Sequence, residues 1–336
     1  PLEAYARERQ AFRARVIEHK QRRAVPVGEH VTLQFEDELT IRYQVQEMVR
    51  AEKMTREPEI LHELETYNEV LTLHGTVMIF LWIVPVVNGA FGNYLIPLMC
   101  GARDMVFPFM NMLSYWAYLL SVIVLVISFF VPGGSTGAGW TLYPPQAISA
   151  GTPGVDLGIL LMLVSLAIFI VAFTMGGLNY VTTVLQARCK GMTLMRMTPF
   201  VWTALCASVL MAFAFPALTV ACGLLALDRI FGMHFFTNAH GGNMMNYPNL
   251  FWIWGHPEVY ILILPAFGIF SEVVATFARK SLFGYKSLVY ATAAIAILSF
   301  TVWLHHFFTM GSSANVNAFF GIPIDQPGDI AIRPVD

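Results

Sequence analysis

The sequence has few charged residues for its length, and most of them lie near its beginning. Only 12% of the 336 residues are charged, whereas a soluble domain typically carries about 25%. Residues 1–70 hold 25 of the 42 charged side chains. Because 56% of all residues are hydrophobic, the remaining part of the chain is predicted to be a membrane protein rather than a soluble domain.

Strong net charge and patterned cysteines are also missing. A net charge of -2 provides no basic surface for phosphates, so the sequence argues against nucleic acid as a partner. The four cysteines have no metal-ligand spacing, and they lie in or beside apolar runs, which favours small buried side chains: Cys100, Cys189, Cys206 and Cys222. The first 70 residues contain no apolar stretch of the length that a signal peptide needs.

Residues 1–70 are therefore predicted to form a small, charged, water-soluble leader of unknown function, whose composition is foreign to that of the membrane region. Its pattern predicts helices over residues 3–20, 42–53 and 57–65. A short alternating stretch at residues 31–35 predicts a strand. The change in composition places the boundary with the membrane region between residues 68 and 73.

The membrane region, residues 71–322, is predicted to be an all-α polytopic bundle of about six transmembrane helices. Closed barrels and helices are the structures that satisfy their backbone polar groups in lipid, and these apolar runs are too long and uniform for barrel strands. Each run can cross a hydrocarbon core of about 30 Å. The six runs are residues 73–99, 109–131, 157–185, 200–225, 250–277 and 288–310.

Positive charges in the connections predict the orientation of these helices. Seven Lys and Arg residues lie in alternate connections, around positions 103, 188–196 and 279–286, and the intervening connections carry only Arg229. The positive-inside rule places the first set in the cytoplasm. The first helix then enters from the outer side, and the leader is expected outside.

Histidine residues at membrane depth are the strongest functional signal, because polar groups there are costly. His256 and Tyr260 are four positions apart, so a helix places them on one face. His305 and His306 stand together in the last apolar run. Three imidazoles from two helices suit copper, iron or zinc. The alternative is that each imidazole is an ordinary hydrogen-bonding group inside the bundle.

Other polar residues give weaker signals. His74 lies at the outer end of the first run, beside Gly75, which would let a planar cofactor or another helix approach closely. Asn93, Asp104 and Asn111 form a polar series on the cytoplasmic side, which suits either a water-lined entry or a solvated loop. Two further histidines are expected in an outer loop as ordinary surface residues: His234 and His240.

Several of these motifs resemble subunit I of the haem-copper terminal oxidases. The resemblance is carried by WGHPEVYILILP at residues 254–265, VWLHHFFTMG at 302–311, HG at 74–75 and GARDMVFP at 101–108. It extends over roughly residues 67–322. GGNMM at 241–245, FSE at 270–272 and NVNAFFG at 315–321 are most similar to the quinol-oxidising branch.

The resemblance implies a respiratory oxidoreductase that reduces O2 to water and moves protons across the membrane. It implies that His256, His305 and His306 bind copper, and that Tyr260 takes part in O–O cleavage as a tyrosine joined to His256. His74 would be an axial ligand of the iron of a low-spin haem. The cofactors implied are thus copper and haem, with two haems expected in the family and one axial ligand recognisable here.

The same resemblance implies a proton pathway that begins at Asp104, passes Asn93 and Asn111 and leads to Glu258. Glu258 would pass protons inward. The residues give a physical reason, because a carboxyl group at membrane depth is costly and marks proton relays.

The ends depart from the family pattern. The chain resembles only the second to seventh spans, and residues 323–336 form a polar, Pro-rich tail. Thr66 and Glu69 stand where quinol-oxidising relatives have a His and a Gln, so the donor is quinol or cytochrome c. The implied partners are oxidase subunits II and III, the donor, O2 and membrane lipid, and the implied location is the bacterial inner membrane. The alternatives are a truncated or fused fragment without redox activity and a proton-conducting or solute-transporting bundle.

Overall fold

The computed structural model describes residues 2–27, 31–34, 37–51, 57–149, 151–152, 154 and 156–321. The predicted tail at residues 323–336 lies outside this part of the chain. The chain divides into two compact units, residues 1–67 and 68–336.

The first unit contains two helices joined by a hairpin, and it ends within a third helix. Helix α1 (Leu2–Gln21) is followed by β1 (Ala24–Val27), β2 (Val31–Gln34) and helix α2 (Glu38–Ala51). The strands pair antiparallel with Val27 opposite Val31. The predicted helix at 3–20 and strand at 31–35 correspond to α1 and β2, whereas β1 was not predicted. The second predicted helix, residues 42–53, begins four residues too late, because Asp37 and Thr40 start α2 earlier.

Carboxylates connect the two helices of this unit. The Asp37 carboxylate accepts a hydrogen bond from the Thr40 amide at 3.1 Å. Its other oxygen lies 2.6 Å from Nε2 of His19. The first contact caps α2, because a side-chain oxygen at a helix start satisfies an unpaired amide. The Glu47 carboxylate accepts hydrogen bonds from two guanidinium nitrogens of Arg9, at 2.7 and 2.9 Å. The contacts of Asp37 with His19 and of Glu47 with Arg9 join α1 to the α2 region.

Acidification is expected to loosen this helix pair. Hydrogen bonding to His19 holds the pKa of Asp37 at about 2, below its ordinary 3.8. Hydrogen bonding to Arg9 likewise holds the pKa of Glu47 at about 2, below 4.5. A lowered folded-state pKa contributes stability above the unfolded-state value and loses it as the pH falls through the folded-state value. Hydrogen exchange of α1 and α2 amides, followed by mass spectrometry, should accelerate between about pH 4.5 and pH 2 beyond the intrinsic pH effect.

The variant Glu47→Gln provides the control for this prediction. It removes one titrating carboxylate, so exchange should already be faster at neutral pH and should depend less on acid. Equal acid dependence in the parent chain and in Glu47→Gln would show that this carboxylate does not hold the helices together.

The first membrane helix is a continuous helical run that begins within the charged residues. Helix α3 (Glu57–Thr76) continues through two π-helical segments, η1 (Val77–Ile83) and η2 (Pro85–Ala90), into α4 (Phe91–Cys100). The predicted helices at 57–65 and 73–99 are thus parts of one run. The polar residues of α3 do not interrupt it, since Glu and His are both compatible with a helix.

Two prolines in the membrane helices leave carbonyl groups that other helices satisfy. Proline has no amide hydrogen, so it cannot bond the carbonyl four residues earlier. The carbonyl of Leu81, four before Pro85, instead receives the hydroxyl of Tyr118 at 2.9 Å. The carbonyl of Ile261, four before Pro265, receives the side-chain amide of Asn88 at 3.2 Å. These bonds fix the first membrane run against its neighbours.

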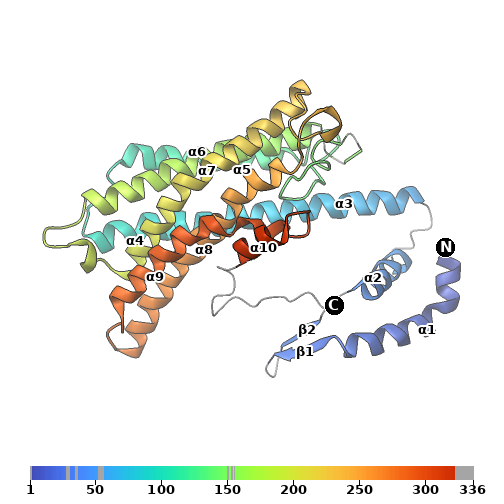
Figure 1. Ribbon diagram of the computed structural model, residues 1–336, viewed down its shortest axis with the longest axis horizontal. Helices are drawn as coiled ribbons and strands as arrows, with labels where there is room; N and C mark the ends of the chain where they lie inside the picture. Colours follow the sequence, from blue (N-terminus) through green and yellow to red (C-terminus); the bar gives the residue numbers. More distant parts are fainter. Residues whose placement is uncertain are drawn as a thin grey trace. The chain divides into compact units, whose positions relative to one another are not determined.

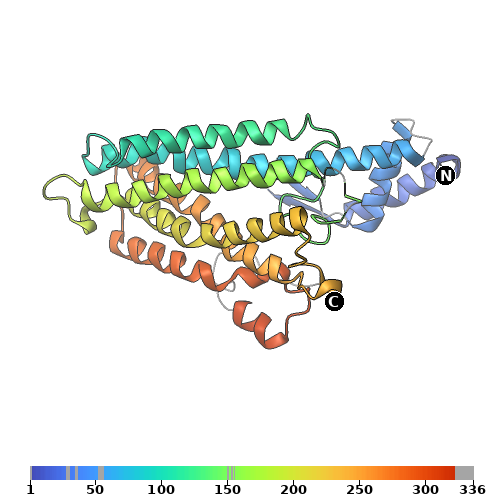
Figure 2. The ribbon, with the colours of Figure 1, turned by 90° about the horizontal axis from the view of Figure 1, so that it is seen from above.

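Four further long helices complete the main part of the second unit. Among the described residues, five helices are long and apolar enough to cross a membrane, which confirms the predicted helical membrane bundle. The long helices lie side by side, with α5 on α6, α6 on α7 and α7 on α8 (Figures 1 and 2). Their bounds are α5 (Pro108–Ile127), α6 (Leu157–Gln186), α7 (Pro199–Phe231) and α8 (Asn246–Ala278).

The sixth predicted run, residues 288–310, is not one long helix. Helix α9 (Tyr285–Leu298) is followed by two 3-10 segments, η5 (Ser299–Thr301) and η6 (Trp303–Phe307), and then by α10 (Ala314–Gly321). Val302 interrupts the helix with φ -125° and ψ -1°. Hydropathy alone could not reveal this interruption, because the residues on both sides of it are equally apolar.

Aromatic side chains fill the core beside the histidine motif. Phe80 of the first membrane run stacks on Trp254 of α8, with ring centroids 5.2 Å apart and planes 8° apart. Phe169 and Phe215 bring α6 and α7 into the same cluster. All four rings are buried. The segment that carries His256 is therefore held from three sides.

Candidate metal centre

His256 lies in the first half of α8 and is only 6% exposed. Pro257 follows it within the same helix. Proline has no amide hydrogen, so residue 257 donates no backbone hydrogen bond within the helix. The aromatic cluster around Trp254 packs against the same part of the helix. The site thus begins on a rigid, buried helix.

His305 and His306 lie on the 3-10 segment η6, opposite α8. A 3-10 helix has three residues per turn, so neighbouring side chains point about 120° apart. The amide of His305 donates to the carbonyl of Val302 at 3.2 Å. The interruption at Val302 therefore changes the direction of the chain just before the two histidines, and both rings reach His256.

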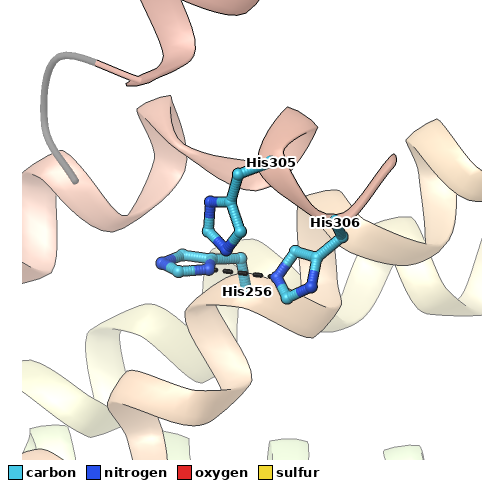
Figure 3. A group of neighbouring side chains, drawn as sticks. All are labelled: His256, His305 and His306. Atoms are coloured by element: carbon cyan, nitrogen blue, oxygen red, sulfur yellow. Dashed lines mark hydrogen bonds between the residues drawn. The ribbon is translucent and has the colours of Figure 1, made fainter. Parts of the chain in front are cut away.

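The three imidazoles converge on one point (Figure 3). One nitrogen from each ring can be chosen so that all three lie within 4.8 Å of one another. Nδ1 of His256 lies 3.2 Å from Nε2 of His306, and the His256 and His305 rings have centroids 4.6 Å apart. Nε2 of His256 is buried and has no hydrogen-bond partner in the described part of the chain.

This donor set fits a transition-metal ion. Imidazole nitrogen is a preferred ligand of copper, zinc and iron. Three imidazoles leave at least one coordination position open for a small molecule. Nδ1 of His256 and Nε2 of His306 face each other, so these two nitrogens would bind an ion held between the rings. Within the part of the chain that the structure describes, these three residues are the group of three or more His, Cys, Asp or Glu side chains that are close enough together to hold a metal ion.

Trp252 packs against the histidine group, and the sequence pattern did not single it out. Its ring stacks on His306 with centroids 3.5 Å apart and planes 4° apart. Its indole nitrogen donates to the hydroxyl of Tyr143. Trp252 is four residues before His256, so helical spacing could have placed it on the same face. Tyr143 lies in a long connection, and no local signal indicates its position.

Tyr260 and Glu258 lie near His256 on the same helix. The rings of His256 and Tyr260 have centroids 4.8 Å apart, as their spacing of four residues predicts. Glu258 is 1% exposed. Both of its oxygens are buried, and the indole of Trp254 is a polar group that faces this carboxyl group. Such a carboxyl group is costly, which makes it a candidate for proton handling.

His74 is not part of this group. Its side chain is exposed on α3, near the end of that helix. Gly75 beside it faces Trp140, because an added Cβ would lie 2.9 Å from the indole ring. The close approach expected at Gly75 is thus made by a tryptophan of the α5–α6 connection. The exposed imidazole is accessible to a metal ion, and within the part of the chain that the structure describes no other histidine packs against it.

Asn93 and Asn111 line one cavity of about 540 Å³ between the first membrane run, α5 and α6. Oδ1 of Asn93 is buried without a partner in the described part of the chain. Tyr180 also lines the cavity, and its hydroxyl donates to the carbonyl of Asn88 at 2.8 Å. Asp104 is exposed in the α4–α5 connection and is not among the lining residues. The structure brings the two asparagines together and leaves Asp104 outside.

Comparison with known proteins identifies the class. Residues 37–323 match the family model described as cytochrome c and quinol oxidase polypeptide I. The chain belongs to this family, and it is an integral membrane protein.

Individual relatives are more than 50% identical. The chain is 55% identical over 264 residues to the alternative cytochrome c oxidase subunit 1 of Bradyrhizobium diazoefficiens, which covers 76% of this chain and 45% of the relative. It is 54% identical over 256 residues to the quinol oxidase subunit 1 of Bacillus subtilis, covering 76% of this chain and 39% of the relative. The ubiquinol oxidase subunit 1 of Acetobacter aceti is 51% identical, with 76% of this chain and 38% of the relative covered. The chain therefore spans less than half the length of these relatives.

Proposed function

We propose that this chain provides the copper-binding part of a terminal oxidase that reduces O2 to water in the bacterial plasma membrane. The convergence of three imidazoles from α8 and η6 carries the proposal. Copper and haem, when bound, would supply electrons to O2. His256, His305 and His306 would hold the copper, and Tyr260 would lie beside it within reach of His256.

The burial of Glu258 supports a role in proton delivery. Reduction of O2 to water consumes protons, and a carboxyl group at membrane depth can take up and release them. Glu258 is two residues from His256 and buried. The proposed route enters at Asp104 and passes the cavity that Asn93 and Asn111 line. Water in a cavity with several polar groups can carry protons between them.

The electron donor separates two versions of this function. The relatives include a cytochrome c oxidase and two quinol oxidases of similar identity. Membrane vesicles from cells that produce the chain together with its partner subunits, proposed to be subunits II and III, should consume O2 with either ubiquinol or reduced cytochrome c. Uptake with neither donor, in vesicles that contain the chain, would contradict the oxidase function and favour a fragment without redox activity.

Replacing Glu258 with Gln is expected to slow oxygen consumption by about 10²-fold or more, the usual contribution of a positioned proton-transfer group. The amide keeps the size of the side chain but cannot release a proton. The rate of O2 uptake by the same vesicles measures the effect.

Glu272→Gln is the matched control for this prediction. Glu272 lies on the same helix, more than three turns further along α8. Its Oε1 is also buried and has no hydrogen-bond partner in the part of the chain that the structure describes. Its replacement should leave the rate unchanged. Equal rates in the parent chain and in Glu258→Gln would exclude Glu258 from proton delivery.

A further inference from the structure

The connection between α7 and α8 places two imidazole rings against each other. His234 and His240 have ring centroids 4.2 Å apart and planes 27° apart. Both side chains are exposed. With Asn243 and Asn246 they line an open cavity of about 310 Å³. The sequence had suggested ordinary surface residues here, because six positions separate the two histidines and no helical spacing relates them.

The backbone of this loop is fixed by hydrogen bonds of the residues that follow His234. The Asp228 carboxylate at the end of α7 receives the amides of Phe235 at 2.6 Å and Phe236 at 2.9 Å. The amide of Asn243 donates to the carbonyl of Phe235 at 2.9 Å. The first part of the loop is thus bonded to α7 and to the returning segment.

His240 is held by the same network. It ends the 3-10 segment η4 (Asn238–His240), and its amide donates to the carbonyl of Thr237 at 3.1 Å. Gly242 then passes so close to His234 that an added Cβ would lie 2.0 Å from the His234 carbonyl oxygen. This close crossing brings the backbone after His240 against the backbone at His234.

We propose that His234 and His240 form a second metal site, which binds a divalent transition-metal ion such as Zn²⁺ from the aqueous phase. Imidazole is a suitable ligand for zinc, copper and nickel. The fixed loop reduces the conformational cost of bringing two donors to one ion. Both rings are exposed, so each can rotate about its side-chain bonds out of the stacked arrangement until one nitrogen of each ring points at the same ion. Water molecules can then complete the coordination. The proposal is independent of the buried triad, since none of the three triad residues lines this cavity.

Zn²⁺ titration of the detergent-purified full chain tests the proposal, with the variants His234→Gln and His240→Gln. Outer-shell partners alone change metal affinity by about 10- to 100-fold, so loss of one of two imidazoles should weaken one class of Zn²⁺ binding at least about tenfold. The control is His62→Gln, which removes an exposed histidine of α3 and should leave the titration unchanged. Parental affinity in either loop variant would overturn the proposal.

A measurement on the unaltered chain covers the case in which the loop variants fail to fold. Diethylpyrocarbonate modifies accessible imidazoles, and mass spectrometry can locate the modification on separate peptides. Zn²⁺ should protect both His234 and His240 while leaving His62 reactive. If the two loop histidines react equally with and without Zn²⁺, they act only as a stacked aromatic pair and the site does not exist.

Discussion

Replacing His256 with Ala is expected to abolish copper binding at the buried centre. His256 is the one residue of the triad that comes from α8, so its loss removes the donor that α8 contributes. Two adjacent imidazoles on a short 3-10 segment remain. Because outer-shell changes alone cost about 10- to 100-fold in affinity, we expect a loss of at least about 100-fold.

Elemental analysis of the detergent-purified chain measures this effect. The comparison is best made in a chain that also carries His234→Gln and His240→Gln, so that copper at the outer loop does not contribute. His62→Ala serves as the control, because its exposed ring lies on α3 and outside the triad. Stoichiometric copper in the parent chain that persists in His256→Ala would show that the triad is not the copper site.

The grouping of the three histidines was predictable from the sequence because its main signals are local. His256 and Tyr260 lie one helical turn apart, and such a spacing fixes their relation wherever the helix is placed. His305 and His306 are adjacent, so any structure that brings one toward α8 brings the other close. Apolar runs of sufficient length likewise fixed the helices α5 to α8 to within a few residues.

What could not be predicted depends on contacts between distant segments. The interruption at Val302 replaces the end of a predicted helix by 3-10 turns, and apolar composition does not distinguish the two. The same holds for the hydroxyl of Tyr118 on the Leu81 carbonyl and for the Asn88 amide on the Ile261 carbonyl. A proline in the sequence shows which carbonyl loses its backbone donor, but it does not show which side chain donates to that carbonyl instead.

The stacked pair of His234 and His240 illustrates the same limit. Their spacing of six residues matches no regular helix face. The rings meet because Asp228 and the crossing at Gly242 fold the loop back on itself. Loop geometry of this kind appears only when the partners of each backbone group are known.

Gly268→Ala is expected to destabilise the packing of α7 on α8, although alanine favours helices over glycine by about 1 kcal/mol. A Cβ at position 268 would lie 2.3 Å from Oγ1 of Thr203 and 2.6 Å from Cα of Phe200. The Phe200 backbone belongs to a buried helix turn and cannot rotate away as a flexible side chain would. Overpacking of this kind costs about 1–3 kcal/mol, so the net effect should be a lower free energy of unfolding.

Gly223→Ala is the matched control, because Gly223 also lies within a long helix and an added Cβ there meets nothing within 4 Å. Its effect should be neutral or stabilising by up to about 1 kcal/mol. Thermal unfolding in detergent should therefore move the two variants in opposite directions. Adding Thr203→Ala to Gly268→Ala should restore only part of the loss, since the contact with Phe200 Cα remains. Equal unfolding temperatures for the two glycine variants would mean that α7 and α8 do not cross at Gly268, and the placement of His256 three turns away would then need another support.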